Sequence, residues 1–234
     1  MFFDWTYVVI VMPFVLLSLW ASSNVNSTFK KFANQHSSRR ITGAQAAQQV
    51  LSANGVGGVK IERVSGNLTD HYDPRTNVIR LSDSVYDATS TAAIGVACHE
   101  AGHAVQYAKN YAPIKLRAAI VPVTNFASKL AMPLILLGLV LTFLESFSFT
   151  LVYVGIACFG LSVVFQLITL PVEFNASRRA MQAIENADIL TDAEQVGARK
   201  TLTAAALTYV AATAVALAQL LRLLIVFGGR RRRD

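Results

Sequence analysis

Four stretches of this 234-residue chain are apolar over enough consecutive positions to cross a membrane. They are residues 2–20, 121–144, 149–172 and 201–227. A helix of about 20 apolar residues spans the hydrocarbon core of a bilayer, which is roughly 30 Å thick. The first stretch lacks the basic region that begins a secretory signal, so we expect a retained anchor over residues 1–20. The second and third are separated by a short turn, which we place at Glu145 and Ser146, and they predict a transmembrane hairpin over residues 121–172.

The fourth stretch is rich in alanine but also contains Thr208, Thr213, Gln219 and Arg222. Its small residues suit close helix packing in a bilayer, and Arg222 lies near enough to the end to reach the headgroups. We therefore predict a C-terminal transmembrane helix over residues 201–227, followed by a basic tail at residues 228–234. A buried helix in a soluble core is the alternative.

The polar remainder comprises residues 21–120 and a returning segment, residues 173–200, that follows the hairpin. Near the start of the first part, Thr42 and Gln45 have the spacing of a capping box. A helix rich in alanine and glutamine is expected from there to Ser52.

Alternation of polar and apolar positions predicts two β-strands, at residues 59–64 and 76–81. The apolar run that follows, residues 92–108, predicts a helix that Ser90 or Thr91 could cap. Residues 21–120 are therefore expected to form a small α+β domain.

The composition fits a membrane protein, because 53% of the residues are hydrophobic and only 15% are charged. The net charge of +7 comes from basic residues beside the apolar stretches, without the interleaved aromatic residues of a nucleic-acid site. Anionic lipid is the simpler partner, and we expect no nucleic acid. The two cysteines, Cys98 and Cys158, lie in separate apolar helices and predict no disulfide.

The candidate chemistry lies in the run 92–108, where residues 99–103 read H-E-x-x-H. Positions four apart share one helix face, so His99 and His103 can reach a single Zn²⁺. Glu100 can then lie beside the metal as a general base. Gly102 would let another segment or a substrate approach closely. The alternative is that both histidines lie on a polar, solvent-exposed helix face. The apolar flanking residues disfavour it, because they predict a buried helix, and burying a His-Glu pair without a partner is costly.

A catalytic zinc needs a third protein ligand, and Glu173 is the best candidate. The hairpin should return the chain to the side from which it entered the membrane, close to the motif helix. We expect Pro171 to start a new helix with Glu173 in its first turn. A carboxylate that only stabilises the start of that helix is the alternative. The competing third ligands are His36, His71, Glu185 and Asp188.

Residues 70–82 and 97–106 resemble the corresponding segments of the YugP-type neutral zinc metallopeptidases of bacteria. The resemblance extends to Tyr111-Ala112-Pro113, to the hairpin and to residues 198–209, so it covers most of the chain. It implies an α-rich membrane protein with four transmembrane helices and a small α+β zincin-like catalytic domain, residues 21–120, split from its returning helix by the transmembrane hairpin.

The plan is also similar, more distantly, to the HtpX-like and prenyl-protein membrane proteases. Those proteins take their third zinc ligand from a glutamate after a helical hairpin, within a pattern E-F-x-A-D-R-x-A. Glu173 matches that glutamate, and the match continues at Phe174, Ala176, Arg178 and Ala180. Ser177 replaces the aspartate, and its hydroxyl can hold a metal-binding imidazole by a hydrogen bond but supplies no charge.

We expect an integral-membrane zinc endopeptidase with one catalytic Zn²⁺ on His99, His103 and Glu173. Glu100 would act as general base toward a zinc-activated water. In zinc peptidases of this design an edge strand binds the substrate backbone by strand addition. The strand at residues 76–81 is our candidate, with these substrate-binding residues: Thr76, Asn77, Val78, Ile79 and Arg80.

Two other functional classes stay open. One is a non-catalytic membrane scaffold or assembly factor, which is disfavoured because structural zinc sites usually have four protein ligands, often cysteines, and no Cys-x-x-Cys is present. The other is a zinc hydrolase of a small amide or lipid. The expected partners are a polypeptide, which can itself be a membrane protein, and membrane lipids.

We expect the protein in a bacterial plasma membrane, with the catalytic side in the cytoplasm. The positive-inside rule places basic residues near the apolar stretches on that side. The arginines of the tail argue for the reverse if the last helix crosses. The residues that favour a cytoplasmic site are Lys30, Lys31, Arg39, Arg40, Lys115, Arg117, Arg178, Arg179, Arg199 and Lys200.

Overall fold

The computed structural model describes residues 5–141, 143 and 145–228, so the predicted tail at residues 229–234 lies outside it. The chain divides into two compact units. We call the described residues of 1–20, 116–170 and 209–234 the membrane unit. Residues 21–115 and 171–208 form the second unit, which we call the mixed unit because it combines helices and strands.

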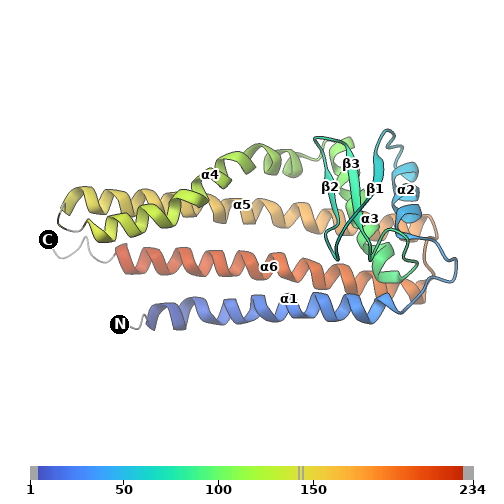
Figure 1. The fold of residues 1–234 in the computed structure, drawn as a ribbon, viewed down its shortest axis with the longest axis horizontal. Coiled ribbons are helices and arrows are strands. Elements are labelled where there is room, and N and C mark those ends of the chain that lie inside the picture. The colour runs from blue at the N-terminus through green and yellow to red at the C-terminus, as the bar shows by residue number, and fades with distance from the viewer. Residues whose placement is uncertain (1–4, 142, 144, 229–234) are drawn as a thin grey trace. The chain divides into compact units, whose positions relative to one another are not determined.

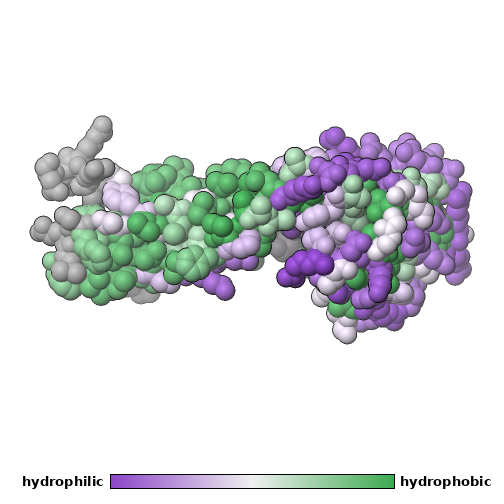
Figure 2. All heavy atoms as spheres, turned by 90° about the horizontal axis from the view of Figure 1, so that it is seen from above, coloured by the Kyte–Doolittle hydropathy of each residue, from purple (hydrophilic) through white to green (hydrophobic). Residues whose placement is uncertain are grey.

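Four helices are long and apolar enough to cross a membrane, as the sequence predicted. A short π-helix, Tyr7–Val11, leads into α1, Met12–Ala33. Helix α4 covers Ala112–Val140, α5 covers Glu145–Asn186 and α6 covers Asp192–Gly228. Each helix extends past its apolar stretch, and α1, α4, α5 and α6 all contribute residues to both units. In Figure 2 the surface of the membrane unit is mostly hydrophobic and that of the mixed unit mostly hydrophilic.

The predicted hairpin is formed by α4 and α5. These helices approach closely, because a Cβ added to Gly155 would lie 2.8 Å from the carbonyl oxygen of Ala131. Glycine therefore permits the close backbone packing that is common between membrane helices. The turn precedes Glu145, where α5 already begins, so its predicted place at Glu145 and Ser146 was slightly wrong.

Two predictions about the returning segment were also wrong. Helix α5 does not restart at Pro171 but runs through it to Asn186. Proline removes one backbone hydrogen bond from a helix interior, and this long helix tolerates that loss. Glu173 is therefore not in a first turn, and stabilisation of a helix start does not explain it. The expected single helix at residues 173–200 is in fact the end of α5, a short link and the start of α6.

The mixed unit contains helices α2, Gly43–Ala53, and α3, Thr91–Ala108, together with a three-stranded sheet (Figure 1). The strands are β1, Lys60–Val64, β2, His71–Asp73, and β3, Val78–Ser82. Both predicted caps are present. Thr42 and Gln45 form the capping box of α2, and the Ser90 hydroxyl accepts a hydrogen bond from the backbone of Ala93.

The sheet order is β1-β3-β2, so the strand predicted at residues 76–81 is central and not an edge. Strand β3 pairs in parallel with β1 and antiparallel with β2. The sequence missed β2, a three-residue strand too short to show alternation. Because Val78, Ile79 and Arg80 have partners on both sides, they cannot accept a substrate strand, and Thr76 and Asn77 precede β3 in a turn. The edge-strand basis for these five substrate-binding residues was wrong.

Helix α3 forms the centre of the mixed unit, and Ala93, Ile94 and Ala97 are fully buried in its core. The helix is closely approached by α6 and α5. A Cβ added to Gly95 would lie 3.2 Å from the Cα of Ala198, and one added to Gly102 would lie 2.7 Å from the carbonyl oxygen of Ala176. The close approach foreseen at Gly102 is thus made by α5.

Candidate metal centre

Three side chains of the mixed unit converge as a candidate metal site: His99 and His103 from α3 and Glu173 from α5. Their ligand atoms all lie within 4.8 Å of one another. One carboxylate oxygen of Glu173 lies 3.3 Å from Nε2 of His99 and 3.5 Å from Nε2 of His103. The side chains are 13%, 11% and 3% exposed, respectively. The structure thus brings together the three residues that the sequence singled out.

Local geometry explains the convergence. The two histidines are four positions apart on α3 and therefore lie on one face. Gly102 lies between them and lets the backbone of α5 approach at Ala176, three residues after Glu173. A larger side chain at this position would separate the helix with two ligands from the helix with the third.

The second nitrogen of each imidazole is held by a different polar group. Nδ1 of His99 lies 3.1 Å from the Ser177 hydroxyl, and Nδ1 of His103 lies 3.0 Å from the side-chain oxygen of Gln106. Both Nε2 atoms are thereby left facing Glu173. Hydrogen bonding of the second ring nitrogen commonly orients histidines that bind metals. The Ser177 hydroxyl, which stands where the distant relatives carry an aspartate, thus does contact an imidazole.

Glu100 is 8% exposed, and its carboxylate forms no hydrogen bond or ion pair within the described part of the chain. It is close enough to His103 and to Asp70 to affect their protonation. A buried carboxylate without a hydrogen-bond donor is costly for stability alone. Such a group beside three converging donors is available to exchange a proton with a bound molecule.

Two pKa shifts reflect this concentration of carboxylates. Burial opposes charge on His103, but its hydrogen bond to Glu173 and the charge of Glu100 outweigh burial and raise the pKa of His103. Burial also raises the pKa of Asp70, and the charge of Glu100 adds to that effect. The backbone N–H of Ser82 donates to Asp70 at 2.7 Å and partly opposes the rise.

The competing third ligands lie elsewhere in the part of the chain that the structure describes. His36 contacts the Thr89 hydroxyl, and the exposed His71 contacts the carbonyl oxygen of Thr69. Glu185 and Asp188 are exposed near the end of α5. The cluster of possible ligands found among the described residues contains none of these four.

Sequence reasoning missed Gln106, Asn175 and Arg179, which lie beside the cluster. Gln106 is fully buried and contacts both His103 and α5. Its place three residues after His103 on the same helix face was a usable signal. Asn175 could not be assigned in this way, because its partner Gln106 is on another helix. Arg179 lies four residues after Asn175 on α5, and its Nε donates to the Asn175 side chain at 2.8 Å.

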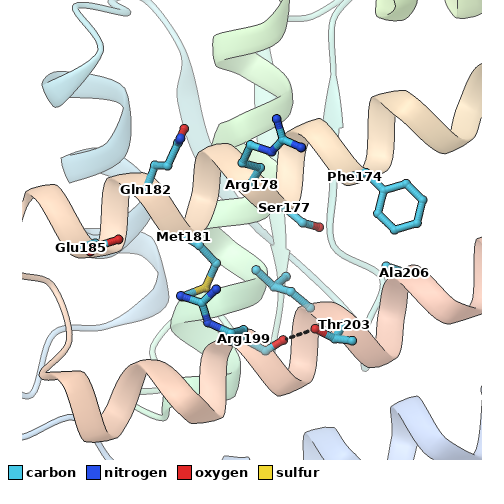
Figure 3. Close-up of a pocket in the computed structure, with 10 residues that line it drawn as sticks. Phe174, Ser177, Arg178, Met181, Gln182, Glu185, Arg199, Thr203 and Ala206 are labelled. Atoms are coloured by element: carbon cyan, nitrogen blue, oxygen red, sulfur yellow. Dashed lines mark hydrogen bonds between the residues drawn. The ribbon is translucent and has the colours of Figure 1, made fainter.

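A hollow of about 320 Å³ lies between the parts of α5 and α6 in the mixed unit (Figure 3). Ser177, whose hydroxyl contacts His99, is one of its lining residues. Apolar groups, including Phe174 and Ala206, line one end, and Glu185 lies at the other. The three ligand side chains do not line this hollow.

The donors fit zinc. Two imidazoles and one carboxylate are a known ligand set of catalytic zinc, and three protein ligands leave a position open for water or substrate. Cys98 precedes the first ligand, but complete burial raises the pKa of its thiol and keeps the thiol protonated. A protonated thiol is a poor metal ligand.

Comparison with known proteins agrees with this chemistry. A family described as "Putative neutral zinc metallopeptidase" matches residues 7–228. The chain is 48% identical over 211 residues to a protein of Bacillus subtilis (strain 168) named "Putative membrane protease YugP". The alignment covers 90% of this chain and 92% of that relative. No solved structure matches the chain. Because the family match covers nearly all of the sequence, the chain belongs to this family of neutral zinc metallopeptidases.

Proposed function

We propose that the protein is an integral-membrane zinc endopeptidase of the gluzincin type, with Glu100 as general base. The observation that carries the proposal is the position of this buried carboxylate, unpartnered within the described chain, beside three converging metal-binding side chains. His99, His103 and Glu173 would hold the zinc.

The residues divide the chemistry between them. When bound, Zn²⁺ would polarise the scissile carbonyl and make a water acidic at the open position. Glu100 takes the proton from the attacking water and later passes it to the leaving amine. Because no described residue donates a hydrogen bond to it, both carboxylate oxygens are available for these transfers.

We propose the outer edge of β2 as the place where an extended substrate backbone binds. Strand β2 is an edge of the sheet, and its Tyr72 packs against Tyr107 of α3 with ring centroids 5.7 Å apart. An edge strand offers free backbone donors and acceptors to an added strand. This role replaces the one expected of residues 76–80.

We place the metal site on the cytoplasmic face of a bacterial plasma membrane, because basic residues flank the apolar stretches there. A single cysteine replacing the exposed Arg39 of the mixed unit would test this. We expect a membrane-impermeant thiol reagent to label it only after intact cells are opened. Labelling in intact cells would reverse the orientation.

The central experiment compares wild type with Glu100→Gln in detergent, measuring bound zinc and cleavage of an unfolded protein. We expect full zinc content and a loss of activity of about 100-fold or more, since general acid–base groups contribute on that scale. Glu185→Gln, at an exposed carboxylate of α5, is the matched control and should retain activity. If zinc-loaded wild type cleaves no peptide, the proposed peptidase activity is refuted. Equal activity of wild type and Glu100→Gln would refute the role of Glu100.

A further inference from the structure

We infer that Arg179, Asn175 and Gln106 form a hydrogen-bonded chain that fixes the tautomer of His103 and directs its Nε2 at the metal. Arg179, Asn175 and Gln106 are positioning residues, since none reaches the three ligand atoms except through His103. The inference rests on the proposed function only in taking His103 as a zinc ligand.

The chain begins at a group that can only donate. The guanidinium of Arg179 has no acceptor atom, so the Asn175 atom 2.8 Å from its Nε must be the amide oxygen. Tyr111 holds the guanidinium from a second direction, because its ring centroid lies 6.0 Å from the central carbon. Arg179 therefore sets which way the Asn175 amide is turned.

Gln106 is the next link, and its amide can take only one orientation. One side-chain atom of Gln106 lies 3.0 Å from the Asn175 oxygen and 2.8 Å from the backbone oxygen of Val172. Both neighbours are acceptors, so this atom must be the NH₂ nitrogen, which donates both of its hydrogens. The Gln106 oxygen is then left to face His103.

The consequence reaches the imidazole. An oxygen 3.0 Å from Nδ1 of His103 requires that Nδ1 carry a proton and donate it. In neutral His103 the lone pair must then be on Nε2, the atom that faces Glu173. Because Gln106 is fully buried, water cannot replace these partners easily.

The same amide also connects the two helices that supply ligands. It starts on α3 and donates to Val172 and Asn175, the residues one before and two after Glu173. Gln106 thus orients one ligand and holds the helix of another. His99 lacks an equivalent, because the Ser177 hydroxyl can donate or accept and does not fix a tautomer.

The test measures zinc dissociation constants by chelator competition on the full-length protein in detergent. We expect Gln106→Leu to weaken zinc binding about 10- to 100-fold, the usual effect of losing the hydrogen-bond partner of a ligand. Gln182→Leu, at an exposed glutamine of α5, is the matched control and should bind like wild type.

The outer links test the direction of the chain. Both contacts of Asn175 are acceptor contacts, so Asn175→Asp should bind zinc like wild type, while Asn175→Leu should weaken binding. Arg179→Met should weaken it less, because the Val172 oxygen still orients Gln106. Arg178→Met is its control, since Arg178 is exposed and forms no hydrogen bond or ion pair with the described residues.

A spectroscopic measurement separates orientation from general stability. The chain has only four histidines, so ¹⁵N-histidine NMR of the zinc-loaded protein can resolve them. In wild type we expect the Nδ1 proton of His103 to exchange slowly with solvent. In Gln106→Leu the same proton should exchange rapidly, and Asn175→Leu takes the place of that variant if it does not fold.

Unchanged zinc affinity in Gln106→Leu would overturn the inference, as would equal losses in Asn175→Asp and Asn175→Leu. If Gln106→Leu does not fold, equal zinc affinity of Asn175→Leu and wild type would overturn it instead. These outcomes depend on zinc binding alone. A protein without peptidase activity would refute the proposed function and leave this result standing.

Discussion

Several threonine hydroxyls of the membrane unit bond back to their own helices, whereas at the candidate metal centre of the mixed unit polar side chains bond between distant segments. Thr124 and Thr213 each donate to the carbonyl oxygen four residues earlier. His99 and Ser177, by contrast, are 78 residues apart in sequence. Local bonds of the first kind form whenever the helix forms, because lipid offers no other partner. Bonds of the second kind form only once distant segments have packed together, and the chemistry of the candidate metal centre depends on them.

The units also use close helix contacts differently. Gly155 brings α5 against α4 in the membrane unit, and Gly102 brings α3 against α5 in the mixed unit. The first contact serves packing, while the second also sets the spacing of the candidate metal ligands. Substitutions of similar size should therefore have different consequences in the two units.

The largest effect is expected from Glu173→Ala, which removes a proposed zinc ligand from the mixed-unit part of α5. We expect zinc binding to be lost. This is a larger effect than removing the hydrogen-bond partner of a ligand, which weakens zinc affinity roughly 10- to 100-fold. Metal analysis after dialysis measures it. Glu185→Ala, at an exposed carboxylate on the same helix, should retain zinc. Stoichiometric zinc in Glu173→Ala would move the third ligand elsewhere.

A pair of glycine substitutions tests the contrast directly. In Gly102→Ala the new methyl group would meet the Ala176 carbonyl at 2.7 Å, and in Gly155→Ala it would meet the side chain of Ile135 at 2.7 Å. Overpacking of this kind costs about 1–3 kcal/mol of folding stability. We expect both variants to unfold at lower temperature in detergent, but only Gly102→Ala to bind zinc more weakly.

Gly160→Ala provides the control for that pair, because nothing lies within 4 Å of the added methyl group. It should retain both thermal stability and zinc. Equal loss of zinc in Gly102→Ala and Gly155→Ala would show that the two contacts do not differ in the way proposed.

A smaller effect is expected from Ser177→Ala, which removes the hydroxyl beside His99. The variant should largely keep its zinc, because the Ser177 hydroxyl can donate or accept and therefore does not fix the tautomer of His99. Chelator competition beside Gln106→Leu measures the difference. If Ser177→Ala loses as much affinity as Gln106→Leu, the two histidines are held equally and the asymmetry inferred above is absent.

The smallest effect concerns pH. Asp70 has a pKa above its ordinary value of 3.8 in the folded protein, because burial and the charge of Glu100 disfavour ionisation. The folded state therefore holds this proton more tightly, and the resulting stability is lost as pH rises from about 3.8 through the raised pKa. The side chain in Asp70→Asn cannot ionise. The difference between the unfolding temperature of this variant and that of wild type should therefore shift in favour of the variant as pH rises over that range. A constant difference across pH would contradict the shift.

Much of the site followed from the sequence, because its strongest signals are local. Helical spacing placed His99 and His103 on one face, and the hairpin predicted that Glu173 would return near them. Gln106 could have been found from its spacing alone. Its two acceptors on α5 could not, because no local pattern reveals which atoms of another helix a buried amide will meet.

The sequence by itself determined four membrane-length helices, the caps of α2 and α3, and the identity of three candidate metal-binding side chains. These features depend on apolar length and on contacts within a few residues, which the order of residues specifies directly. Only the tertiary structure decided that β3 is central, that α5 continues through Pro171, and that Arg179 acts on His103 through two amides. Each of these depends on which distant segments pack together, and that choice is made by the energy of the whole mixed unit.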